Sequence, residues 1–208
     1  MYLLSEKLEF PDLSQASHDG LLAYGGDLSA ERLILAYSKG IFPWFEEGQP
    51  ILWWSPNPRF VLYPSELKVS KSLRKTINNN EFQITINKSF KAVVIACAKA
   101  KRKGQSGTWI TSKMIDAYCT LFDLGFAKSV DVWQNNKLVG GLYGIDLNKD
   151  VFCGESMFSK ISDASKVGFA TFVETSNYKL IDCQLHTNHL EKFGAKYISR
   201  EDFIKTIN

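Results

Sequence analysis

The placement of proline divides this chain into two parts with different architectures. All six prolines lie within the first 64 residues, and the stretch from Ser65 to Asn208 contains none. Proline fixes φ and removes a backbone donor, so it is excluded from the interior of most helices and sheets. We therefore predict an N-terminal domain of loops and short elements at residues 1–64, followed by a domain of regular helix and sheet at residues 65–208.

One helix is expected in the N-terminal part. Ser29 is a suitable N-cap, Leu33, Ala36 and Tyr37 recur at helical spacing, and Gly40 is placed to end the helix. An aromatic segment follows, in GIFPWF and ILWWSP. These rings either pack between the two domains or form a platform for a base or an apolar side chain, and the sequence leaves both readings open.

The second part alternates between helical and strand patterns. Helices are expected at residues 89–100, 111–126 and 162–175, and strands at 82–87, 129–133, 138–147, 151–158 and 179–185. The turn-rich pieces QNNK and NKD separate three consecutive strands, which is the pattern of an antiparallel meander. The fold class is therefore α+β, with a central and mostly antiparallel sheet.

The last expected strand, KLIDCQL, places two polar residues on one face. Period-two alternation sends Asp182 and Gln184 to one side of the strand and Ile181, Cys183 and Leu185 to the other, which is apolar enough for a core. The polar face is either solvated or lines a cleft. Cys183, on the core side, is then a poor candidate for a nucleophile.

Glu155 is a charged residue within the apolar strand VFCGESMF. A buried carboxylate needs a partner, so Glu155 either orients a substrate ammonium group or makes a structural hydrogen bond.

Composition and charge argue against several classes of protein. No stretch approaches the roughly 20 apolar residues of a membrane span, and the start MYLLSEKLEFPD lacks the regions of a signal peptide. The four cysteines are scattered without a C-x-x-C pair, and His186 and His189 have no carboxylate motif around them, so we expect no metal site. These features predict a cytoplasmic protein with reduced thiols.

Basic residues form two clusters, although the net charge of +3 is small. Each cluster either contacts nucleic-acid phosphates or is a solvated face. The first contains Lys68, Lys71, Arg74 and Lys75, and the second contains Lys99, Lys101, Arg102 and Lys103.

The residues resemble a known family over nearly the whole chain. GLLAYGGDLSAERLILAYSKGIFPWF with ILWWSPNPRFVL is similar to the N-terminal half of the leucyl/phenylalanyl-tRNA–protein transferase family. GTWI, LVGGLYG, FCGESMFS, ASK and LIDCQ follow in the family's order and at similar spacing. The sequence departs from the family's usual pattern in FPDLSQASHDG and LEKFGA, which lie outside these motifs.

The resemblance implies a small N-terminal domain packed on a GNAT-like acyltransferase domain. It implies transfer of Leu, Phe and, less well, Met from aminoacyl-tRNA to proteins that begin with Arg or Lys, which marks them for N-end rule degradation. Because the donor carries its own activated acyl group, no metal ion and no other cofactor is expected.

The resemblance also assigns roles to residues of this chain. Asp182 and Gln184 match the proposed catalytic pair of the family. Asp182 is expected to accept or relay the proton of the attacking amine and Gln184 to orient that amine. The aminoacyl-adenosine site is expected to contain Glu155, which attracts the cationic acceptor or fixes the adenosine, together with Trp44, Trp109, Leu142, Phe152 and Phe172.

Two other functions are weighed against this one. An acetyl-CoA-dependent N-acetyltransferase should have glycines before the helix that holds the pyrophosphate, and the segment here reads SKISDASK. A non-catalytic tRNA-binding module would explain the basic clusters, but it would leave Asp182 and Gln184 without a role.

Overall fold

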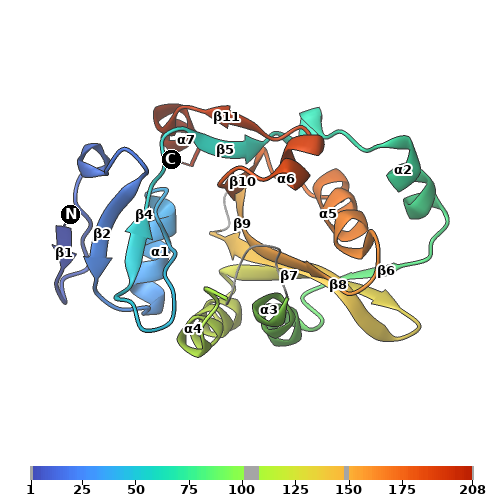
Figure 1. Ribbon diagram of the computed structural model, residues 1–208, viewed down its shortest axis with the longest axis horizontal. Coiled ribbons are helices and arrows are strands. Elements are labelled where there is room, and N and C mark those ends of the chain that lie inside the picture. Colours follow the sequence, from blue (N-terminus) through green and yellow to red (C-terminus); the bar gives the residue numbers. More distant parts are fainter. Residues whose placement is uncertain (1, 101–107, 148–149, 208) are drawn as a thin grey trace.

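The computed structural model describes residues 2–100, 108–147 and 150–207 and contains two sheets. The smaller sheet, at one end of the molecule (Figure 1), has four strands in the order β1-β2-β4-β3. Its strands pair antiparallel except for β1 with β2. They are short: β1 (Tyr2–Leu4), β2 (Leu21–Gly25), β3 (Phe42–Pro43) and β4 (Leu52–Trp54).

The larger sheet has seven strands in the order β11-β5-β10-β9-β8-β7-β6. Among these described strands only β9 and β10 pair parallel, so the expectation of a mostly antiparallel sheet is confirmed. The strands are β5 (Arg59–Leu62), β6 (Gln83–Ile86), β7 (Ala127–Gln134), β8 (Lys137–Asp146), β9 (Val151–Ser159), β10 (Leu180–Gln184) and β11 (Lys196–Ile198).

Helices cover both faces of the larger sheet (Figure 1). The helices α3 and α4 pack on one face, and α5 packs on the other with α2 beyond it. Alternate strand residues therefore enter different cores, as Tyr143 lies in the core under α3 and α4 while Leu142 lies in the core under α5. The helices are α1 (Ala30–Ser38), α2 (Lys71–Asn78), α3 (Phe90–Lys99), α4 (Ser112–Asp123), α5 (Ala164–Thr175), α6 (Asn188–Lys192) and α7 (Arg200–Ile207).

The local signals for two expected helices are confirmed. Ser29 caps α1 by accepting a hydrogen bond from the Arg32 amide, and Gly40, with φ of 71°, follows its end. Thr111 caps α4 through the Met114 amide, and Gly125 follows that helix with φ of 83°.

The domain boundary expected at Pro64 stays a prediction, and the strand just before it belongs to the larger sheet. The strand Arg59–Leu62 precedes Pro64 but lies between β10 and β11 in the larger sheet. The change between the two sheets falls after Trp54. The two parts also share one hydrophobic core, which joins Trp53 of β4 to Tyr118 of α4.

Part of the second basic cluster, Lys101, Arg102 and Lys103, lies outside the described residues. Among the residues that are described, none of the helices has the length and apolar character required to cross a membrane.

Candidate active site

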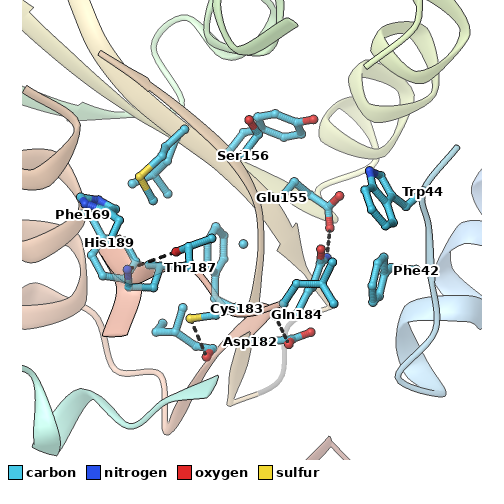
Figure 2. A pocket seen from close by; sticks show the side chains of 18 of the residues that line it. Phe42, Trp44, Glu155, Ser156, Phe169, Asp182, Cys183, Gln184, Thr187 and His189 are labelled. Carbon is cyan, nitrogen blue, oxygen red and sulfur yellow. Dashed lines mark hydrogen bonds between the residues drawn. The ribbon is translucent and has the colours of Figure 1, made fainter. Parts of the chain in front are cut away.

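A cavity of about 530 Å³ is lined by β3 of the smaller sheet, by β8, β9 and β10 of the larger sheet, and by α5 and α6. Figure 2 shows Phe42 and Trp44 at one end, Phe169 and His189 at the other, and Glu155 and Gln184 between them. The polar pair thus lies at the centre of the cavity, and the end formed by α5 combines apolar side chains with the His189 imidazole.

Two interruptions of the strand ladders create this cavity. The parallel pairing of β9 with β10 ends at the pair Cys153 and Asp182. Beyond it β9 contains a bulge, because Ser156 lies opposite Tyr143 and Gly154 opposite Gly144, which leaves Glu155 as the extra residue.

The strand β10 contains a matching bulge. Asp182 lies opposite Val61 and Gln184 opposite Phe60, so Cys183 is the extra residue. Gln184 has a φ of 61°, a left-handed conformation that a residue with a Cβ adopts rarely. Bulges and strained backbone re-aim side chains, and here they bring Glu155 and Gln184 together.

The Glu155 carboxylate accepts hydrogen bonds from two neutral groups. Tyr118 Oη donates to Oε2 at 2.7 Å, and Gln184 Nε2 donates to Oε1 at 2.7 Å. Burial raises the pKa of Glu155 to about 7, although hydrogen bonds from Tyr118 and Gln184 act in the opposite direction. Glu155 can therefore change its charge near neutral pH.

A second tyrosine extends this hydrogen-bonded chain into the N-terminal part. The hydroxyls of Tyr37, on α1, and Tyr118, on α4, lie 2.8 Å apart in a buried contact. Burial, followed by the nearby Glu155 charge, raises the pKa of both phenols, so both stay protonated. The small sheet and its helix thus help to support the central carboxylate.

Asp182 has a different environment. Its carboxylate accepts two hydrogen bonds from Arg59, from Nε at 2.8 Å and Nη2 at 2.6 Å, and a third from the Gln184 amide at 2.9 Å. The side chains of Arg59 and Asp182 are 1% and 0% exposed. Asp182 is among the residues that line the cavity, but both of its carboxylate oxygens accept hydrogen bonds from Arg59. The proton-accepting role expected for Asp182 stays a prediction, and this pairing argues against it.

Strand alternation also gave a partly wrong assignment for β10. Ile181 is buried as expected, but Cys183 lines the cavity and Leu185 is 40% exposed. The bulge at Cys183 is the physical reason, because an extra residue reverses the alternation after it. Burial raises the pKa of the Cys183 thiol far above its ordinary value, so the thiol stays protonated.

Besides Glu155, four of the five apolar residues expected at the aminoacyl-adenosine site line the cavity, namely Trp44, Trp109, Leu142 and Phe152. Phe172 is 5% exposed and packs behind Phe152, with ring centroids 4.8 Å apart. The expectation that Phe172 lines the cavity is thus wrong. Phe169, one helical turn earlier on the same face of α5, lines it instead.

The first basic cluster lies on and before α2, which packs on the outer side of α5. Lys68, Lys71 and Lys75 are exposed, whereas both guanidinium Nη atoms of Arg74 pair with the Glu174 carboxylate on α5. The helix α5 therefore lies between the first basic cluster and the cavity.

Two important residues were not found from the sequence. Arg59 precedes the apolar run FVL, and a charged residue opening a buried strand indicates that a charged partner is needed. Tyr118 falls on the core face of its helix with Met114 and Leu121, so its spacing suggests only packing. No local pattern pairs it with Glu155, which is 37 residues away.

Comparisons with known proteins agree with the sequence resemblance. Residues 61–208 match the family "Leucyl/phenylalanyl-tRNA protein transferase", and residues 26–57 match its N-terminal domain. A leucyl/phenylalanyl-tRNA–protein transferase from Flavobacterium johnsoniae is 56% identical over 100% of this chain and 99% of its own length. One from Flavobacterium psychrophilum is 54% identical over 99% of this chain and 98% of its own.

Among solved structures, a GCN5-related N-acetyltransferase from Kribbella flavida is similar with a TM-score of 0.40 and 10% identity, over 79% of this chain and 59% of that chain. The family match, by contrast, spans more than half of the chain, and the relatives align from end to end. The chain therefore belongs to the leucyl/phenylalanyl-tRNA–protein transferase family of aminoacyltransferases.

Proposed function

We propose that this protein transfers Leu, Phe and, less well, Met from aminoacyl-tRNA to the N-terminal Arg or Lys of acceptor proteins, which marks them for N-end rule degradation. The observation that supports this most directly is the cavity. It joins an apolar chamber to a hydrogen-bonded carboxylate–amide pair, Glu155 and Gln184. We expect the protein to work in the cytoplasm, where charged tRNA is present.

The apolar chamber suits the side chain of the donor. It is formed by Leu142, Phe152, Met157, Phe169 and Ile181. Leu, Phe and Met have a slim methylene at Cβ, whereas Val and Ile are broad there and rigid at χ1. Because one methylene in an apolar pocket is worth about 1–3 kcal/mol, we expect discrimination against Ile to be partial.

Gln184 is placed to orient the attacking amine. Its Nε2 donates to Glu155, so its Oε1 is the atom left to accept a hydrogen bond from the amine. Asp182 is a positioning residue in this proposal, because it holds the Gln184 backbone amide and is itself fixed by Arg59.

Glu155 is the group we propose as proton acceptor. An acceptor α-amine has a pKa of about 7.7–8, so part of it arrives as ammonium and must lose a proton before it attacks. A carboxylate with a pKa of about 7 is well matched to receive that proton. The neutral amine nitrogen then bonds to the ester carbonyl carbon and the carbon–oxygen bond to the tRNA breaks. The further proton that the nitrogen loses as it becomes an amide passes to the departing tRNA 3′-oxygen.

We propose that the terminal adenosine and the phosphates of the tRNA bind outside the chamber, on opposite sides of it. Trp44 is 38% exposed at the opposite end, and we propose that it and Trp109 stack on the terminal adenosine. Lys68, Lys71, Arg74 and Lys75 are proposed to contact tRNA phosphates beyond α5.

A transfer assay with labelled Phe-tRNA and a peptide that begins with Arg tests this function. We expect labelled peptide to form without added metal or acetyl-CoA, and a peptide with a blocked N-terminus to remain unlabelled. Acetyl transfer from acetyl-CoA to the same peptide, with no transfer from Phe-tRNA, would contradict the proposal.

A further inference from the structure

Gly154, in β9, is a glycine that the folded protein itself does not require. A Cβ at this position would meet only the Asp182 carbonyl oxygen, at 3.6 Å, which is an ordinary contact. Every other glycine that the structure describes either has a left-handed φ or would bring a Cβ within 3.0 Å of a neighbouring atom. Gly144, for example, would place a Cβ 2.3 Å from the Cys153 carbonyl oxygen.

The open space beside Gly154 is the cavity, which this residue lines. In β9 it follows Phe152 on the same face, at the point where Glu155 begins the bulge. Phe152 belongs to the apolar chamber and Glu155 to the polar pair. A side chain at residue 154 would therefore project where the apolar and polar parts of the cavity meet.

The neighbouring strand leaves this position uncovered. The β9–β10 pairing stops at Cys153 and Asp182, one residue before Gly154. A ligand can thus approach the Gly154 backbone more closely than it can approach a residue with a side chain.

We infer that the Cα and ester carbonyl of the donor aminoacyl group cross β9 directly over Gly154, and that the residue is a glycine because the donor needs this clearance. The inference rests on the proposed function, since it requires an aminoacyl group whose side chain enters the chamber and whose ester reaches Gln184. The connecting Cα must then lie between Phe152 and Glu155.

Substitution with alanine tests this inference, with valine as a graded second variant. The probe is a stable 3′-leucylamido-adenosine, whose binding is measured by calorimetry together with single-turnover transfer from Leu-tRNA. We expect Gly154→Ala to melt close to the wild type and to raise the Kd of the probe by about 10–200-fold, the range for one misplaced carbon in an apolar site. Gly154→Val should raise it further.

Gly144→Ala is the matched structural control, and it should lower the melting temperature because its Cβ has no room. Wild-type affinity for the probe in Gly154→Ala would overturn the inference, as would a loss of stability comparable to that of Gly144→Ala. Failure of the proposed function gives a separate result, in which the wild type itself neither binds the probe nor transfers Leu.

Discussion

Two carboxylates at the same cavity have opposite electrostatic environments. Asp182 is paired with a cation on both oxygens, through Arg59, and its side chain is entirely buried. Glu155 is half-buried and accepts hydrogen bonds from the neutral groups of Tyr118 and Gln184. The first environment stabilises a fixed charge, whereas the second allows the charge to change.

The difference separates positioning from proton transfer. The paired and buried carboxylate of Asp182 accepts a hydrogen bond from the Gln184 amide, and Gln184 has a left-handed backbone conformation. A carboxyl with a pKa raised to about 7 can exchange a proton under physiological conditions. The residue that the sequence resemblance linked to proton transfer is therefore the less suitable of the two.

Replacement of Glu155 should cause the largest loss of activity. We expect Glu155→Gln to lower single-turnover transfer by about 10²–10⁴, the usual contribution of an acid–base group. Its melting temperature should stay near that of the wild type, because the substitution removes a charge that burial disfavours. Wild-type transfer rates in this variant would exclude Glu155 as the proton acceptor.

Replacement of Asp182 should instead act on stability. We expect Asp182→Ala to cost about 3–5 kcal/mol of unfolding free energy, because it leaves the Arg59 guanidinium buried and unpaired. Cys183→Ala is the neighbouring control and should cost far less, since Cys183 is only partly buried. Chemical denaturation measures both. A stable Asp182→Ala protein with greatly reduced transfer would reverse the roles of the two carboxylates.

The apolar end of the cavity offers a parallel comparison between Phe169 and Phe172. We expect Phe169→Ala to lower transfer from Leu- and Phe-tRNA by about 10–200-fold, and to affect Val- and Ile-tRNA less, because it widens the chamber. Phe172→Ala should lower transfer from all donors alike, because it removes support behind Phe152. Transfer assays with four charged tRNAs measure this, and equal losses for all donors in Phe169→Ala would contradict the assignment.

The smallest expected effect concerns the basic cluster on α2. The affinity for tRNA falls as the salt concentration rises, and each phosphate contact steepens the slope of log affinity against log salt by about 0.7–0.9. Changing Lys71 and Lys75 to Ala should flatten this slope, whereas Arg74→Ala should change it less, because Arg74 already pairs with Glu174. Lys205→Ala, on α7, is the control. Binding of uncharged tRNA at several salt concentrations measures the slopes, and an unchanged slope would mean that the cluster is only a solvated face.

The sequence predicted the helices α1, α3, α4 and α5 and the strands β6 to β10 because their signals are local, but it did not predict the short strands β1 to β5 and β11 or the helices α2, α6 and α7. Ser29 and Thr111 are helix caps within their own segments, and the antiparallel meander follows from strand pattern and turns. The active site was less predictable because it depends on two bulges and on a long-range ion pair. Alternation cannot reveal an extra residue such as Cys183, and Arg59 meets Asp182 across 123 residues.

The pH dependence of transfer tests the central claim most directly. We predict that kcat/KM rises with pH through an acid limb near pH 7, as Glu155 loses its proton. Ionisation of the acceptor amine should add a second limb near pH ~8, and the position of this limb should be the same in every variant. Tyr118→Phe removes a hydrogen bond that lowers the Glu155 pKa, so the first limb should move to higher pH while the second stays in place. A first limb that is absent, or that Tyr118→Phe leaves unmoved, would contradict the assignment of Glu155 as the proton acceptor.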